Sequence, residues 1–225
     1  MELYSQPYRR RTSRLSISLS QTSDANGGHQ LSVETLKDAP GTLLRLCAVL
    51  YRHGWNIRSA EICTEENGQI LDRFVVVPTG DGVDEIIFET MMQDLERLLF
   101  DALSVHEYIS EDYLAARPSA ESSVDRLSEE RPEVRLPQNA DEPYLELSGR
   151  DRPGLLQAIA HVLAHRDIDV LEAEIQTIGE RVANRFLINP TDARLGIMPD
   201  QSSAKQTPEQ RSFRDHLAAS LRELL

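Results

Sequence analysis

The chain has 225 residues, 40% of them hydrophobic and 27% charged, and this ordinary globular composition excludes fibrous and wholly disordered proteins. Its 37 acidic and 24 basic side chains give a net charge of −13, which disfavours nucleic-acid binding because an acidic surface repels phosphate groups. Apolar runs are too short to span a membrane, and residues 1–14 lack the apolar core of a signal peptide. The two cysteines, Cys47 and Cys63, cannot form a disulfide framework, so the sequence predicts a cytoplasmic protein.

The first half of the chain has the patterns of alternating strands and two helices. In chain order, we expect strands at 14–19 and 30–35, a helix after Pro40-Gly41, strands at 57–64 and 70–77, a helix at 84–103 and a fourth strand at 104–109. The first helix has its apolar face at the i, i+3, i+4, i+7 positions Leu43, Leu46, Cys47 and Leu50. Cys47 and Cys63 therefore fall within expected elements, which favours buried structural thiols over reactive ones.

The second half shows the same order of patterns. We expect strands at 133–136 and 144–148, a helix after Pro153-Gly154, strands at 170–177 and 182–188, and a helix at 208–225. The expected apolar face of the first of these helices is Leu156, Ile159, Ala160 and Leu163, and that of the second is Phe213, Leu217, Leu221 and Leu224. Because this half ends at its helix, no fourth strand is expected there. The composition of 110–132 predicts a linker, and that of 191–207 predicts a loop.

The two halves are copies of one unit. Asp38-Ala39-Pro40-Gly41 recurs as Asp151-Arg152-Pro153-Gly154, and at this offset of 113 residues ten of the 27 positions from 38 to 64 are identical. The offset drops to 112 at Arg73 and Arg185, which places the lost residue in the hairpin turn. Preserved strands around a shortened turn indicate a duplicated domain.

Each copy has the order β-α-β-β-α-β, which predicts a ferredoxin-like α+β domain with both helices on one face of an antiparallel sheet. We predict a first domain at 13–109 with a leading extra strand, a linker at 110–132, and a second domain at 133–225 with its own leading strand. Each sheet has an edge that needs protection, so the copies are expected to pack side by side.

The Asp-x-Pro-Gly turns are the strongest candidate binding elements. Each precedes a helix N-terminus, where unpaired N–H groups and the helix dipole favour an anion. Asp38 and Asp151 could pair with an ammonium group, and together these groups suit a free amino acid. The alternative is that the aspartates cap the helices and that Pro-Gly only turns the chain.

Other reactive side chains favour structural roles. His161 and His165 have the i, i+4 spacing of a two-ligand metal site, but no further motif completes one, so no metal is expected. Lys37 and Lys205 are expected on the surface rather than in a Schiff base. The Arg9-Arg10-Arg11 run favours a solvated terminus over a docking patch. The motifs indicate no catalytic residue and no cofactor.

Taken together, the Asp-x-Pro-Gly turn, Gly54-Trp55-Asn56-Ile57 one helix later and the following hairpin resemble the ACT-domain family. The string from Thr177 to Val182, after Asp151-Arg152-Pro153-Gly154, is similar to the last ACT domain of the PII-protein uridylyltransferases, and the first copy resembles their first ACT domain. The resemblance implies a stand-alone tandem ACT sensor of nitrogen metabolism that binds an amino acid, glutamine-like, and modulates a partner protein. A homodimer is compatible with it. The motifs for nucleotidyl transfer and phosphohydrolysis have no counterpart here, so an enzyme is not expected.

The resemblance also places the ligand, since ACT pairs bind where the Pro-Gly turn of one copy meets the second strand of the other. One such seam joins Asp151, Arg152, Pro153 and Gly154 to Asn56. The other joins Asp38, Ala39, Pro40 and Gly41 to Asp169. The first is favoured, because Asp169 would repel a ligand carboxylate unless it meets the ammonium group instead. One occupied site per chain is therefore expected, at the seam of Gly154 and Asn56. Asn56→Ala is therefore expected to weaken binding more than Asp169→Ala.

Two departures from the family pattern motivate an alternative function. Ala39 stands where the family turn has Arg or Gln, and Asp169 stands where it has Asn or Ser. The alternative is an ACT protein that binds a partner but has lost its small-molecule ligand. An enzyme fragment of the uridylyltransferase type is a third and weaker reading.

Overall fold

A computed structural model describes residues 8–21, 28–35, 41–65, 68–78, 85–100, 105–108, 132–137, 144–152, 154–189, 194–195 and 206–225. The elements of the first half are β1 (Tyr8–Arg11), β2 (Leu15–Gln21), β3 (His29–Thr35), α1 (Thr42–Arg52), β4 (Trp55–Cys63), β5 (Ile70–Pro78), α2 (Glu85–Phe100) and α3 (Val105–Tyr108). Those of the second half are β6 (Glu133–Arg135), β7 (Tyr144–Arg150), α5 (Leu155–His165), β8 (Val170–Ile178), β9 (Arg181–Ile188) and α6 (Pro208–Arg222).

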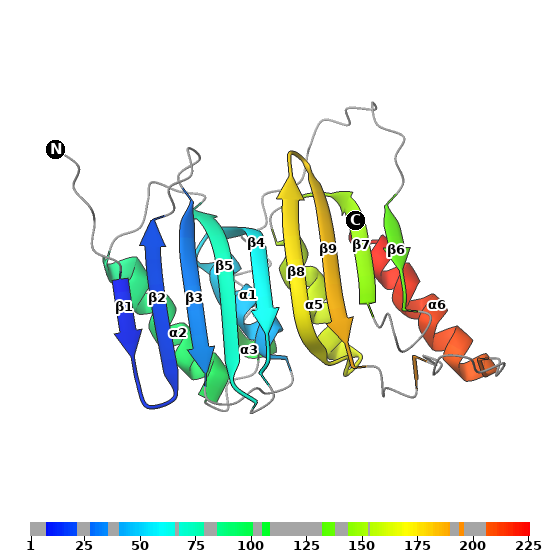
Figure 1. The fold of residues 1–225 in the computed structure, drawn as a ribbon, viewed down its shortest axis with the longest axis horizontal. Coiled ribbons are helices and arrows are strands. Elements are labelled where there is room, and N and C mark those ends of the chain that lie inside the picture. Colours follow the sequence, from blue (N-terminus) through cyan, green and yellow to red (C-terminus); the bar gives the residue numbers. More distant parts are fainter. Residues whose placement is uncertain are drawn as a thin grey trace.

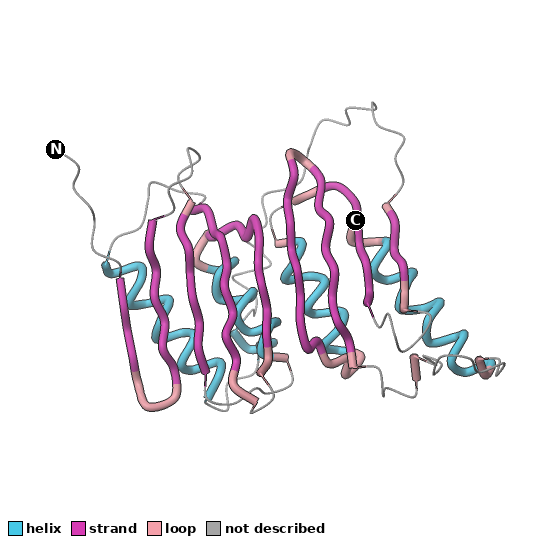
Figure 2. Tube along the Cα trace, viewed as in Figure 1, coloured by secondary structure: helices cyan, strands magenta, loops and turns pink. Residues whose placement is uncertain are grey.

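The strands form one nine-stranded sheet in the order β1-β2-β3-β5-β4-β8-β9-β7-β6 (Figure 1). Every neighbouring pair is antiparallel. The described helices lie behind the sheet, all on one of its faces (Figure 2). The predicted α+β class, with an antiparallel sheet and helices on one face, is confirmed.

The two copies join through their second strands, as the prediction of side-by-side packing required. β4 pairs with β8 from Ser59↔Gln176 to Cys63↔Glu172, and α1 packs against α5. Glu61 lies opposite Glu174, its own equivalent in the repeat. The junction therefore has local two-fold symmetry, and each copy offers the same edge to the other.

The predicted fourth strand at 104–109 is wrong, because residues 105–108 form the short helix α3. The place beside β3 is already taken by the leading strand β2, which pairs with β3 from Leu15↔Thr35 to Gln21↔His29. A closing strand thus has no edge left to join. Strands β2 and β6 lie at the places of the expected leading strands.

The arginine run near the start of the chain forms a strand rather than a solvated terminus. β1 pairs with β2 from Tyr8↔Leu19 to Arg11↔Ser16. The Arg10 guanidinium contacts the carboxylate of Glu89 and lies 3.3 Å from that of Glu96, both on α2. These contacts to the helix layer fix the edge strand.

The core lies between the sheet and its helices. The predicted faces of α1 and α5 are buried, namely Leu43, Leu46, Cys47 and Leu50, and Leu156, Ile159, Ala160 and Leu163. Burial, with a smaller contribution from Asp72, raises the pKa of the Cys47 thiol, and burial and nearby carboxylates raise that of Cys63. Both thiols therefore stay protonated at neutral pH, as structural cysteines do.

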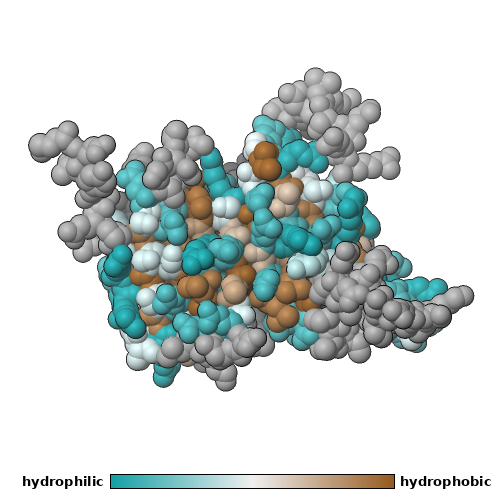
Figure 3. All heavy atoms as spheres, viewed as in Figure 1, coloured by the Kyte–Doolittle hydropathy of each residue, from teal (hydrophilic) through white to brown (hydrophobic). Residues whose placement is uncertain are grey.

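The opposite face of the sheet carries polar and apolar side chains side by side (Figure 3). An ion pair between Arg73 and Glu61, 3.1 Å long, crosses this face. Within the described part of the chain, no helix is both long enough and apolar enough to cross a membrane.

Helix α3 is fastened by a cluster of polar contacts, which gives a prediction. The Tyr108 hydroxyl donates to Asp94 Oδ2 over 2.8 Å, and His53 Nε2 lies 2.9 Å from the same oxygen. Burial and the bond to Asp94 raise the pKa of Tyr108, so the phenol remains a donor. Tyr108→Phe is expected to lower the free energy of unfolding by about 1–2 kcal/mol, measured by urea denaturation.

Tyr144→Phe is the matched control for Tyr108→Phe. The Tyr144 ring packs under the Arg185 guanidinium at 3.6 Å, and the described residues offer its hydroxyl no hydrogen-bond partner. A change of less than about 0.5 kcal/mol is expected there. Equal losses in the two variants would mean that the Asp94 bond does not stabilise the fold.

Candidate functional site

The glycines of the two Asp-x-Pro-Gly turns begin the paired helices α1 and α5. Gly41 has φ +79° and Gly154 has φ +77°, the left-handed conformation that glycine adopts without strain. Neither helix has a side-chain hydrogen bond at its N-cap. The N-cap residue of each helix is therefore the glycine itself and not an aspartate. Asp38, Ala39, Pro40 and Pro153 lie outside the described residues.

Each helix start faces the second strand of the other copy, and this creates two seams. The first, which we call the closed seam, brings Asp151, Arg152 and Gly154 to Asn56. The second, which we call the open seam, brings Gly41 to Asp169. The structure thus assembles the described residues of both predicted sites.

The two seams differ in free volume. The cavity of the open seam measures about 440 Å³, within the range of small-molecule sites. The cavity of the closed seam measures about 20 Å³, which holds about one water molecule. Only the open seam has room for a ligand in the structure as it stands.

The linings of the two seams are the same positions of the repeat. From the open to the closed seam, the lining pairs include Ile62 and Ile175, Thr64 and Thr177, Ile70 and Val182, Asp72 and Asn184, Ala164 and Tyr51, Ile168 and Trp55, and Asp169 and Asn56. The seams are therefore two versions of one site, and their differences can be assigned to particular substitutions.

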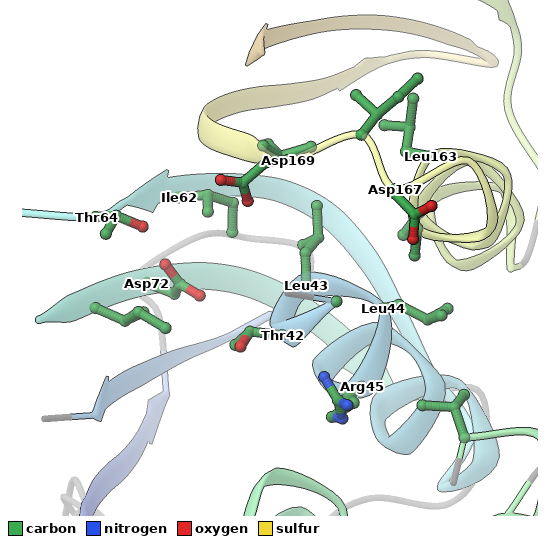
Figure 4. A pocket seen from close by; sticks show the side chains of 17 residues that line it. Thr42, Leu43, Leu44, Arg45, Ile62, Thr64, Asp72, Leu163, Asp167 and Asp169 are labelled. Atoms are coloured by element: carbon green, nitrogen blue, oxygen red, sulfur yellow. The ribbon is translucent and has the colours of Figure 1, made fainter. Parts of the chain in front are cut away.

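The open seam is rich in oxygen atoms that accept hydrogen bonds. Figure 4 shows the carboxyl groups of Asp72 and Asp169 and the hydroxyl of Thr64 directed toward the same space. Asp72 is 1% exposed on β5, and its Oδ1 accepts a hydrogen bond from the Cys63 N–H over 3.3 Å. Asp169 is exposed at the start of β8. One carboxylate therefore lies deep in the cavity and the other at its mouth.

The positive side of the open seam lies on α1. The first turn of a helix has N–H groups without partners inside the helix, and they attract a negative group. Arg45, one turn further along α1, also lines the cavity, and its Nη1 would lie 3.3 Å from a Cβ added at Gly41. The seam thus offers acceptors on its strand side and donors on its helix side, the arrangement that a zwitterion needs.

The sequence analysis missed Asp72 and Arg45 as lining residues. A signal for Asp72 was present, because Ile70, Asp72, Phe74 and Val76 share one face of a strand and three of them are apolar. A carboxylate on a buried face is costly unless it has partners, so its position marks a polar site. No comparable pattern marks Arg45.

No metal centre is visible among the described residues, where no three His, Cys, Asp or Glu side chains come together. The His161 and His165 rings stack in parallel with centroids 6.0 Å apart on the exposed side of α5. They lie outside both seams.

Comparison with known proteins shows the family. Residues 29–100 and 144–196 match the ACT domain. The chain belongs to the ACT-domain family. The predicted tandem of ACT domains is confirmed, and with it the ferredoxin-like class. The match points to a regulatory domain rather than a catalytic one.

The relatives of this ACT pair are large enzymes. The chain is similar to a bifunctional uridylyltransferase/uridylyl-removing enzyme of Cupriavidus pinatubonensis, with 35% identity over 191 residues, or 80% of the chain and 21% of the enzyme. It is 34% identical over 187 residues to the enzyme of that name in Ralstonia nicotianae, covering 81% of the chain and 21% of the enzyme. The chain thus spans about a fifth of the length of these relatives.

A crystal structure of an unknown protein from Galdieria sulphuraria aligns over 88% of the chain and 90% of that protein, with 16% identity and a TM-score of 0.24. This likeness is too weak to support any inference.

Proposed function

We propose that the chain is an ACT sensor that binds an amino acid in the open seam and modulates a partner protein. The observation that carries the proposal is the cavity of about 440 Å³ at the junction of the two domains. The start of α1 lines one side of this cavity, and Asp72 and Asp169 line the other. An amino acid fits the charges on both sides of this cavity. Its ammonium group would lie between the two carboxylates, and its carboxylate would face the first turn of α1.

The junction is a suitable place for regulation. The β4–β8 pairing and the α1–α5 contact both cross it, so a ligand there touches both copies. Binding energy that differs between two arrangements of the copies shifts their populations and the surface offered to a partner. The proposed partner is a nitrogen-signalling protein, in keeping with the resemblance to the uridylyltransferases.

The proposed site is not the seam that the sequence favoured. Sequence reasoning weighed only the chemistry of Asn56 against that of Asp169, whereas the remaining volume at the Asn56 seam admits about one water molecule. We therefore move the proposed ligand to the open seam, where the two aspartates bind its ammonium group rather than oppose its carboxylate.

The site assignment is tested by a pair of matched variants. Asp169→Asn is expected to weaken binding about 10- to 100-fold, because a charge-assisted hydrogen bond to the ammonium group contributes roughly 1.5–3 kcal/mol. Asn56→Ala in the closed seam is the control and should leave affinity unchanged. A thermal-shift screen of the standard amino acids identifies the ligand, and titration calorimetry measures each variant.

Two results would change the proposal. A larger loss in Asn56→Ala than in Asp169→Asn would return the site to the closed seam. If no amino acid raises the melting temperature, the ACT pair does not sense amino acids, and the alternative of a purely partner-binding protein is favoured.

A further inference from the structure

We propose that Tyr51 determines how many ligands the chain holds: its ring occupies the ligand space of the closed seam and leaves the open seam as the single site. This inference rests on the proposed function for its ligand. Tyr51 lies in the last turn of α1 and is the repeat equivalent of Ala164 in α5, at the offset of 113 residues. Each of these side chains faces the helix-starting glycine of the opposite copy.

The contact at Gly154 shows how completely the ring fills the seam. A Cβ added at Gly154 would lie 3.0 Å from Tyr51 Cζ and 2.8 Å from Cε2, and the second distance is shorter than real Cβ atoms show. A Cβ added at Gly41 would lie 4.0 Å from the Ala164 Cβ, an ordinary contact. The ring therefore lies directly over the turn where a ligand carboxylate would bind. The equivalent place in the open seam holds the Ala164 methyl group and the end of the Arg45 side chain, which is itself a donor for a carboxylate.

Three further lining pairs do not explain the closure in the same way. Ile62 and Thr64 are matched by identical residues, Ile175 and Thr177. Trp55 is larger than its equivalent Ile168, but its ring is 2% exposed and packs edge-on against His29 with centroids 5.5 Å apart. Trp55 is thus part of the core of the first copy, and Tyr51 is the large side chain at Gly154.

A second observation shows that the closed seam keeps the character of a binding site. Asn184 lines it at the position of Asp72, is 4% exposed, and its Oδ1 has no hydrogen-bond partner among the described residues. A buried acceptor without a partner costs roughly 1–3 kcal/mol. An ammonium group in this seam would supply the missing donor.

The chemistry of the closed seam defines the ligand it would take once opened. Asn56 and Asn184 stand where the open seam has Asp169 and Asp72, so two negative charges are absent. The first turn of α5 and Arg152 form the positive side, and Asp151 is the one carboxylate of the described lining. An opened seam therefore suits a neutral α-amino acid, whereas the open seam with its two aspartates tolerates an additional positive charge.

The test counts binding sites in four proteins by titration calorimetry with each standard amino acid. We expect one site in the wild type, two in Tyr51→Ala and none in Ala164→Tyr. In the double variant, Tyr51→Ala with Ala164→Tyr, we expect one site, because one seam is opened and the other is closed. Tyr51→Phe is the matched control, since it keeps the ring and should keep one site. Circular dichroism confirms the fold of each protein, and Tyr51→Val replaces Tyr51→Ala if the latter does not fold.

The outcomes separate this proposal from the proposed function. One site in both the wild type and Tyr51→Ala overturns the role of Tyr51 and leaves the sensor function standing. No site in the wild type but one in Tyr51→Ala supports the role of Tyr51 and overturns ligand binding in the open seam. Two sites in the wild type, or none in any of the proteins, overturn the role of Tyr51.

Discussion

Arg214→Leu is expected to lower the free energy of unfolding by about 2–5 kcal/mol, since it leaves two buried carbonyl groups without a donor. Arg214 is 7% exposed on α6, and its Nη1 donates to the carbonyl oxygens of Pro137 at 2.7 Å and Leu195 at 2.9 Å. Burial lowers the pKa of Arg214, but a guanidinium with donors bound to two carbonyls stays charged at neutral pH. This side chain therefore joins α6 to the segments after β6 and β9.

Urea denaturation measures the effect of Arg214→Leu, with Arg211→Leu as the matched control. Arg211 lies one turn earlier on the same helix and is exposed, so its replacement should change the free energy of unfolding by less than about 0.5 kcal/mol. Arg214→Lys should fall between the two, because an ammonium group can still donate to one of the carbonyls. Losses of equal size in the two Leu variants would show that the Arg214 bonds contribute nothing specific.

Arg214 also shows where prediction from the sequence pattern ends. The pattern predicted Phe213, Leu217, Leu221 and Leu224 as the inner face of this helix. Leu217 and Leu221 are buried as predicted, and Phe213 and Leu224 are half-buried against the core. Arg214 and Ala218 are buried as well. A pattern based on polarity places an arginine on the exposed face of a helix. Arg214 can be buried because segments distant in sequence supply its hydrogen-bond partners, which the pattern does not show.

The fold was predictable where the local pattern of polar and apolar residues is the same in both copies. It was less predictable where two segments could pair with the same strand of the sheet. The order of strands and helices followed from alternation, helical spacing and the turns at Gly41 and Gly154. The closing strand at 104–109 was wrong, because the sequence cannot show that β2 has already paired with β3. The junction through β4 and β8 was expected only as side-by-side packing, without its register.

The candidate site was predictable in its members and not in its volume. The repeat offset pairs Gly154 with Asn56 and Gly41 with Asp169 through the family resemblance, and the structure brings the members of each pair together. On our proposal, the packing of the Tyr51 ring decides which seam is open. No sequence motif marks position 51, so the sequence did not indicate this role. The sequence analysis therefore compared the seams by the charge of their side chains and did not include the volume that remains free in each.

Gly154→Ala is expected to cost about 2–4 kcal/mol of stability, of which about 1–2 kcal/mol comes from a Cβ in the left-handed conformation and the rest from overpacking against Tyr51. Gly41→Ala has nearly the same backbone conformation, with φ +79° against +77°. Its Cβ would meet the movable end of Arg45 at 3.3 Å instead of a ring at 2.8 Å. Gly41→Ala should therefore cost only the backbone part, about 1–2 kcal/mol.

A double-mutant cycle isolates the contribution of the ring. In the Tyr51→Ala background, Gly154→Ala should cost no more than Gly41→Ala does in the wild type, which gives a coupling energy of about 1–2 kcal/mol between positions 51 and 154. This measurement needs no ligand, so it reports the closure of the seam independently of binding. A coupling energy near zero would mean that the Tyr51 ring does not press on Gly154 in solution, and the closed seam would then be open to a ligand in the wild-type chain.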